Sequence, residues 1–257
     1  MSRIFITGSA DGLGLMAARL LIEEGHNVVL HARNEQRASD AMAAAPGAES
    51  VLIGDLSTIG ANIKLAKDVN ESGPFDAVIH NAAIGYRESR KIVTPDGLSD
   101  LFAINSLSPY ILTCLINKPS RLIYTSSALH QQGDPGLKDL NWNDRAWNGL
   151  QAYSDSKFHN LIVALAVARK WKNVLSNAVE PGWVATKMGG PGASDSLKEG
   201  PKTQAWLALG EDPDTLVTGE YFYHQKTKRF NNAAADAELQ DTFLSEYGRL
   251  SGITFPE

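Results

Sequence analysis

Short runs of β-branched and aliphatic residues alternate with longer helical segments along most of this chain. The runs expected to form strands are 3–7, 27–32, 50–54, 75–80, 120–126, 173–179 and 217–223. Apolar residues recur at helical spacing in segments 12–24, 34–45, 57–70, about 97–116 and about 150–171. Such alternation builds right-handed crossovers and a parallel sheet with helices on both faces, and the nearly continuous apolar runs suit strands buried on both sides. The sequence therefore predicts an α/β fold of the Rossmann type, a doubly wound parallel sheet of about seven strands.

The chain shows no linker, internal repeat or low-complexity segment, so we expect one domain spanning residues 1–257. The segment from Met188 to Ser194 is rich in glycine and proline, which stop both helices and strands. It follows a predicted strand, at the edge where open α/β sheets bind ligands. A substrate lid at about 187–205 is one interpretation, and an ordinary surface loop is the other. The polar tail 226–257 is expected to wrap the surface as a helix.

Composition narrows the classes of partner. A net charge of −5 gives no electrostatic reason to expect nucleic acid or an anionic membrane as a ligand. The chain begins in a strand-like segment without the features of a signal peptide, and no apolar run approaches the ~18 residues of a membrane span. We therefore expect a cytoplasmic protein. The single cysteine, Cys114, excludes an internal disulfide and is expected to pack as a buried apolar residue.

A glycine cluster follows the first predicted strand and precedes the first predicted helix, with the spacing G-x-x-x-G-x-G. Glycine allows a sharp turn and a close approach to a pyrophosphate, which would face the N-terminus of the helix. A plain tight turn is the alternative, but a strand–glycine–helix order is the context that dinucleotide binding requires. The predicted phosphate-binding residues are Gly8, Ser9, Asp11, Gly12, Leu13 and Gly14.

The second predicted strand ends without the acidic residue that would hold the adenosine ribose hydroxyls of NAD. Arg33 stands there instead, and a guanidinium can pair with a 2′-phosphate. This favours NADP over NAD; the alternative is that Arg33 is only a solvated residue at a helix start. After the third and fourth strands come further candidate cofactor contacts, namely Asp55 and Leu56, then Asn81, Ala82 and Ala83.

Tyr153 and Lys157 are four residues apart in a predicted helix, so their side chains leave the same face. A phenol is a poor acid or base near neutral pH, and an adjacent ammonium is expected to lower its pKa into the range of general acid–base catalysis. Ser126 and Ser127 end the fifth predicted strand, where one hydroxyl could hold a substrate carbonyl. Successive side chains of a strand point in opposite directions, so only one of the two serines is expected to do so.

Taken in order, these motifs resemble the short-chain dehydrogenase/reductase family over most of the chain. The matching residues are Thr7-Gly8 through Gly14, Asp55-Leu56, Asn81-Ala82-Ala83, Asn105, Ser127, Tyr153 with Lys157, and Pro181-Gly182. Several ordered motifs are far more specific than any one of them alone.

The resemblance implies a role for each matching residue. Tyr153 would be the general acid that protonates the carbonyl oxygen during reduction, and Ser127 would orient and polarise the carbonyl. Lys157 would bind the cofactor ribose, and Asn105 would support a water-linked proton relay. The segment Pro181-Gly182-Trp183-Val184-Ala185-Thr186 looks like the one that contacts nicotinamide, which adds Pro181, Gly182, Val184 and Thr186 to the cofactor contacts.

Three features depart from the usual family pattern. The stretch between Ser127 and Tyr153 is long and contains Trp142 and Trp147, as in the retinol-dehydrogenase-like branch, whose members favour NADP and apolar carbonyls. The Asn-Ala-Gly motif of the family is Asn-Ala-Ala here. Position 11 is Asp11, where many NADP-using relatives carry a basic residue, and this leaves Arg33 almost alone to meet a 2′-phosphate.

The leading hypothesis is thus an NADP-dependent carbonyl reductase or alcohol dehydrogenase that acts on a small molecule, for which the resemblance implies an apolar body. A non-catalytic sensor or scaffold that binds NADP on the same fold is the alternative from another class. Reduction of an activated C=C bond, or epimerisation, ranks lower. Relatives are often dimers or tetramers, so a homodimer or homotetramer is also considered. His80, His130 and His159 lack the spacing of metal ligands, and we expect them to be structural.

Overall fold

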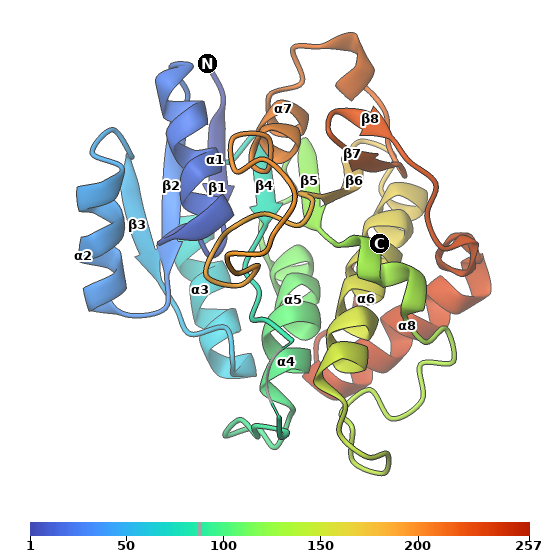
Figure 1. Ribbon diagram of the computed structural model, residues 1–257. Coiled ribbons are helices and arrows are strands. Elements are labelled where there is room, and N and C mark those ends of the chain that lie inside the picture. Colours follow the sequence, from blue (N-terminus) through green and yellow to red (C-terminus); the bar gives the residue numbers. More distant parts are fainter. Residues whose placement is uncertain (87–88) are drawn as a thin grey trace.

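The computed structural model describes residues 1–86 and 89–257, and in these residues eight strands form one sheet in the order β3-β2-β1-β4-β5-β6-β7-β8 (Figure 1). The strands are β1 (Arg3–Ile6), β2 (Asn27–Ala32), β3 (Ser50–Ile53), β4 (Ala77–His80), β5 (Arg121–Thr125), β6 (Leu175–Glu180), β7 (Tyr221–Tyr223) and β8 (Lys226–Thr227). Neighbouring strands from β3 to β7 run parallel, and only β8 is antiparallel. The predicted doubly wound fold is confirmed, with the two-residue β8 added at one edge.

The helices largely match their predicted positions. They are α1 (Gly12–Glu23), α2 (Glu35–Ala44), α3 (Ile59–Glu71), α4 (Asp100–Phe102), α5 (Ser108–Leu115), α6 (Gly149–Lys170), α7 (Lys202–Leu209) and α8 (Ala237–Ser251). The segment predicted as one helix at about 97–116 is interrupted, because a π-helical turn over Ala103–Leu107 separates α4 from α5. Such turns are rare and are found frequently at functional sites.

Alternate residues of strands β1 to β7 enter two separate apolar layers. Ile4 and Ile6 of β1 pack with α1, α2 and α7 on one face, whereas Phe5 packs with α3, α5 and α6 on the other. The residues divide in this way because successive side chains of a strand point to opposite faces of the sheet. The helices on both faces explain why the strands read as continuous apolar runs.

The C-terminal tail forms the predicted helix, but this helix also contributes side chains to the core. Phe243 and Tyr247 of α8 are buried, and the Tyr247 ring contacts the rings of Phe102 and Tyr110 at centroid distances of 5.4 and 5.5 Å. The helix α8 therefore closes the core over α5 and α6.

Two expectations drawn from composition can be compared with the structure. Among the described residues, none of the helices combines the length and apolar character that crossing a membrane demands. Cys114 lies partly buried against the main core, and burial raises the pKa of its thiol to about 12. Its thiol is therefore protonated and unreactive at neutral pH.

The order of the strands determines where a ligand can bind. From the centre of the sheet, β1, β2 and β3 follow one another toward one edge, and β4, β5 and β6 follow one another toward the other edge. The direction in which successive strands are added therefore reverses between β1 and β4. Open α/β sheets bind ligands in the crevice at this point, beyond the carboxyl ends of the strands. The glycine-rich turn follows β1 and Asn81 follows β4, which places both at this crevice.

Candidate active site

The glycine-rich turn has the geometry of a phosphate cradle. Gly8 and Gly12 have left-handed φ angles of 64° and 55°. A Cβ on Gly8 would lie 2.7 Å from the Cα of Ala82, and one on Gly14 would lie 2.5 Å from the Nδ2 of Asn81, so both positions require glycine. A Cβ on Gly12 would meet nothing within 4 Å, at the start of α1. The first amide groups of a helix lack partners within it, so this open space suits an anion, and a dinucleotide pyrophosphate fits there.

Asn81 joins the end of β4 to this turn. Its side-chain amide donates to the carbonyl oxygens of Thr7 and Gly8, both at 3.1 Å. In return, the hydroxyl of Thr7 accepts from the backbone amides of Asn81 and Ala82, at 3.0 and 3.1 Å. The side chain of Asn81 thus holds the crevice together, and Ala82 and Ala83 line its partly buried wall.

Charged side chains gather where the adenosine half of a dinucleotide would lie. Arg33 is exposed at the end of β2, and Asp55 is exposed after β3. The carboxylate of Asp11 forms two ion pairs, with Arg37 at 2.6 Å and with Lys187 at 3.1 Å. Sequence reasoning missed both cations, although the position of Arg37, four residues after Arg33, was a usable signal.

Two of the predicted contacts have side chains directed into the protein. The Ser9 hydroxyl is fully buried; it donates to the carbonyl oxygen of Ile6 and accepts from the amide of His31, both at 2.8 Å. Leu56 is buried in the main core. Both side chains therefore support the fold of the cofactor edge, and the backbone amide of Ser9 also donates within the protein, to the carbonyl oxygen of His31 at 3.2 Å.

The two serines at the end of β5 are distinguished by the pleat of the strand. The buried Ser126 hydroxyl donates to the carbonyl oxygen of Lys157 at 2.8 Å. The side chain of Ser127 instead lies near Tyr153 of α6, whose pKa it lowers, and its hydroxyl accepts from the backbone amide of Leu129 at 3.3 Å. The ring of His130 holds Ser127 in place, because its Nδ1 lies 2.7 Å from the carbonyl oxygen of Ser127. Ser127 is thus the serine that meets Tyr153.

The expected effect of Lys157 on Tyr153 is not found in this structure. Burial and the neighbouring Tyr86 raise the pKa of Tyr153, and only the side chain of Ser127 acts in the other direction. The Lys157 Nζ lies 5.4 Å from the centroid of the Tyr153 ring and donates to the carbonyl oxygen of Thr125 at 3.0 Å. Burial lowers the pKa of Lys157 to about 7, so this side chain is only partly protonated at neutral pH.

Asn105 lies in the π-helical turn and is fully buried. Its Oδ1 accepts from the amide of Ile84 at 2.8 Å, and its Nδ2 donates to the carbonyl oxygen of Ile84 at 3.0 Å and to Ser156 at 3.3 Å. The side chain therefore fixes the loop after β4 beside the helix that carries Tyr153.

The segment predicted as a lid crosses the crevice before α7 (orange in Figure 1). The Tyr153 hydroxyl lies 3.8 Å from the sulfur of Met188, and the two tyrosine rings of Tyr86 and Tyr153 meet edge to face at 5.3 Å. On the other side of the segment, Gln204 donates to the carbonyl oxygen of Leu13 at 3.3 Å. Met188 therefore occupies the position beside Tyr153 where a substrate oxygen would have to lie.

The segment that was expected to contact nicotinamide follows β6. Gly182 has a left-handed φ of 86°, and Pro181 and Gly182 are partly exposed. Val184 is buried and pairs with Asp195 across the lid. The hydroxyl of Thr186 accepts from the amide of Gly189 at 3.2 Å. These contacts join the segment Pro181–Thr186 to the segment predicted as a lid, so the two form one continuous loop between β6 and α7.

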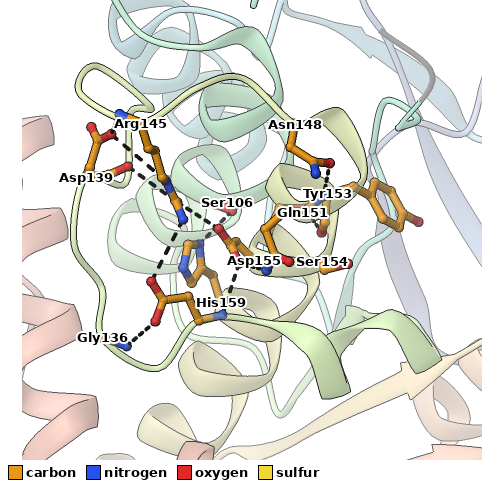
Figure 2. A network of polar contacts seen from close by, with 12 residues as sticks. Ser106, Gly136, Asp139, Arg145, Asn148, Gln151, Tyr153, Ser154, Asp155 and His159 are labelled. Atoms are coloured by element: carbon orange, nitrogen blue, oxygen red, sulfur yellow. Dashed lines mark hydrogen bonds and ion pairs between the residues drawn. The ribbon is translucent and has the colours of Figure 1, made fainter. Parts of the chain in front are cut away.

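A buried carboxylate on α6 anchors the long stretch between Ser127 and Tyr153. Figure 2 shows Arg145 reaching Asp155 from this stretch, while the Tyr153 ring leaves the helix on another side. The guanidinium lies 2.8 Å from Asp155 and stacks 3.7 Å above the Trp142 ring. Trp142 has a left-handed φ of 54°, a conformation that bulky residues avoid, so surrounding contacts must hold it. Arg145 therefore fixes Trp142, which packs in the same apolar cluster as Tyr153.

Replacing Arg145 by leucine should destabilise the protein by about 2 kcal/mol, because Asp155 would keep a buried charge without its cationic partner, with only the amide of Asp134 and the side chain of Gln151 still donating to it. The matched control is Lys67→Met, which breaks the exposed pair between Lys67 and Glu71 and should cost less than about 0.5 kcal/mol. Urea unfolding of both variants measures the difference. Equal losses in the two variants would show that Arg145 does not anchor this stretch.

The three histidines that the sequence singled out have protein partners. His80 contacts the hydroxyl of Thr113 at 3.3 Å, and His159 contacts that of Tyr247 at 2.9 Å. Within residues 1–86 and 89–257, no group of His, Cys, Asp and Glu has the arrangement of a metal site.

Comparison with known proteins establishes the family. Residues 8–216 match the family model described as enoyl-(acyl carrier protein) reductase. The short-chain dehydrogenase chry4 of Gibberella zeae is 43% identical over 260 residues, which cover 100% of this chain and 99% of that protein. The short-chain dehydrogenase chyC of Penicillium rubens is 42% identical over 260 residues and is covered completely, as is this chain. The chain belongs to the short-chain dehydrogenase/reductase family of oxidoreductases.

Solved structures agree on the fold. An uncharacterized protein of Mycobacterium paratuberculosis superposes with a TM-score of 0.85 at 24% identity, covering 100% of this chain and 96% of that one. An NADPH-bound carbonyl reductase from chicken fatty liver superposes with a TM-score of 0.68 at 18% identity, covering 90% of this chain and 99% of that one.

Proposed function

We propose that this protein transfers a hydride between NADP(H) and a small carbonyl or alcohol, with residues 1–257 acting as one catalytic domain in the cytoplasm. The observation that carries the proposal is the position of Tyr153 at the carboxyl edge of the sheet, with the Lys157 Nζ 5.4 Å from its ring and Ser127 near it, close to a glycine turn that fits a pyrophosphate. NADPH bound there would supply the hydride.

The residues of the chain then have distinct tasks. Ser127 donates a hydrogen bond to the carbonyl oxygen and polarises it, and Tyr153 gives that oxygen its proton. Lys157, buried next to Tyr153, offers its Nζ to the ribose hydroxyls and stays within reach of the phenol. Met188 has to leave the Tyr153 hydroxyl before the substrate oxygen can take its place, so the segment 187–205 acts as a lid.

The surroundings of Tyr153 favour an apolar substrate. Around the cluster of Leu101, Trp142, Ala152 and Tyr153 pack five partly buried apolar side chains, namely Ile84, Tyr86, Leu129, Trp147 and Met188. Aromatic rings and a thioether adapt well to flat apolar groups. The substrate class is therefore an aldehyde or ketone with an apolar body.

The preference for NADP over NAD is supported by two cations. Arg33 lies exposed beside the adenosine edge, and Arg37 reaches the glycine turn through Asp11. A guanidinium pairs well with a phosphate. The carbonyl reductase of chicken fatty liver, which has the same fold, binds NADPH.

Arg33→Ala should weaken binding of NADPH roughly tenfold, because it removes a charged partner of the 2′-phosphate. Binding of NADH, which lacks that phosphate, should change by less than about twofold and serves as the internal control. Fluorescence titration measures both affinities. A parallel loss for the two cofactors would mean that Arg33 does not read the 2′-phosphate.

The function is tested by mixing the purified protein with NADPH and matched aldehydes and ketones. Loss of the absorbance of reduced nicotinamide in the presence of an apolar carbonyl is the expected result. Tight binding of NADPH without oxidation across the panel would instead support a non-catalytic sensor.

A further inference from the structure

His31 of β2 lies directly beneath the glycine-rich turn and is 2% exposed. Its Nδ1 lies 2.9 Å from the backbone nitrogen of Gly8, and its Nε2 lies 2.9 Å from the carbonyl oxygen of Gly54. An amide N–H can only donate, so Nδ1 must accept; a carbonyl can only accept, so Nε2 must carry the proton. Two backbone groups therefore select one neutral tautomer of this ring.

The ring connects the ends of three strands. Gly8 follows β1, His31 belongs to β2, and Gly54 follows β3. The backbone of His31 adds two bonds to Ser9, since its amide donates to the Ser9 hydroxyl at 2.8 Å and its carbonyl accepts from the Ser9 amide at 3.2 Å. Asn81 holds the carbonyl of Gly8 from the opposite side. The N–H and the C=O of Gly8 are thus both fixed by side chains that come from neighbouring strands.

The charge state of the ring follows from its surroundings. Burial lowers the pKa of His31 to about 4, although the carboxylate of Asp55 after β3 favours the protonated form. From β1 the ring meets Phe5, whose ring centroid is 6.3 Å away. At neutral pH His31 is neutral, which leaves Nδ1 free to accept from Gly8.

We propose that His31 is a positioning residue of the dinucleotide site, which turns the Gly8 amide inward and so sets the loop that presents the first amide groups of α1 to the pyrophosphate. The inference rests on the proposed function, since it assumes that the glycine turn binds a dinucleotide. His31 itself need not touch the cofactor. It acts through Gly8, and the acceptor at the Nδ1 position is the part that matters for binding.

Two conservative variants separate the two bonds of the ring. In His31→Asn, the amide oxygen can take the position of Nδ1 and accept from Gly8, while the donor to Gly54 is lost. In His31→Gln, the amide nitrogen can take the position of Nε2 and donate to Gly54, while the acceptor for Gly8 is lost. Each variant removes one buried hydrogen bond, so their thermal stabilities should fall by similar amounts.

The dissociation constant of NADPH, measured by fluorescence titration, distinguishes them. We expect His31→Asn to bind within about threefold of the wild type and His31→Gln to bind on the order of tenfold more weakly. Equal weakening in both variants, or none in His31→Gln, would overturn the proposal. Absence of NADPH binding by the wild type would instead refute the proposed function.

A measurement on the unaltered protein covers the case in which a variant does not fold. In 15N spectra of the imidazole groups, His31 should show the Nε2–H tautomer at neutral pH, with and without NADPH. A protonated ring, or the Nδ1–H tautomer in either state, would contradict the inferred role.

Discussion

Tyr153→Phe should lower the turnover number for carbonyl reduction by about 10²–10⁴-fold, the range that a positioned general acid contributes. The phenyl ring still fills the space between Tyr86 and Met188, so the pocket keeps its shape. The dissociation constant of NADPH should therefore stay within about twofold. Steady-state kinetics and fluorescence titration give the two quantities.

Tyr110→Phe is the matched control for this change. It also removes a tyrosine hydroxyl from a buried position, where that hydroxyl donates to the carbonyl oxygen of Ile253 at 2.8 Å in the C-terminal segment. The control should lose about 1 kcal/mol of stability and keep its turnover number. If Tyr153→Phe turned over as fast as the wild type, Tyr153 would not be the proton donor.

Lys157→Met should have two effects of opposite sign. Because the buried ammonium is held at a cost in solvation, methionine should raise the free energy of unfolding of the ligand-free protein at pH 7 by a few kcal/mol. The carbonyl oxygen of Thr125 keeps a partner, since Asn160 also donates to it at 3.1 Å. Activity should fall at least about 10²-fold, because the proposed contact of Lys157 with the cofactor ribose is gone.

The pH dependence of stability tests the same variant. The pKa of Lys157 is about 7 in the folded protein and 10.5 in its ordinary state, so between these values the unfolded chain binds the extra proton. Stability should therefore rise from pH 7 to pH 9 by up to about 1.4 kcal/mol per pH unit through this residue, and Lys157→Met should lack that rise. Urea unfolding at the two pH values measures it. Identical slopes in the wild type and the variant would mean that Lys157 is not held in its weakened state.

Much of the fold was predictable because the spacing of apolar residues distinguishes strands from helices. The π-helical turn around Asn105 was not, since apolar spacing does not distinguish it from a continuous helix. The tail was placed on the surface because its charged residues outnumber Phe243 and Tyr247, which the core nevertheless buries.

The candidate catalytic residues could be singled out for a different reason, namely that ordered motifs place them at one edge of a parallel sheet. Their neighbours were not. Lys187 meets Asp11 across 176 positions of sequence, and Arg145 meets Asp155 on a side of α6 away from Tyr153. His31 reads as an ordinary strand residue, and only the structure brings its ring under Gly8.

Transfer of deuterium tests the central claim most directly. The wild-type protein is incubated with NADPH that carries deuterium in both hydrogen positions of the reactive carbon of nicotinamide and with apolar aldehydes and ketones, and the products are examined by mass spectrometry. We expect an alcohol that carries one deuterium on the former carbonyl carbon, made by the wild type and not by Tyr153→Phe. Binding of the cofactor with no deuterium transferred to any carbonyl would contradict the proposed function.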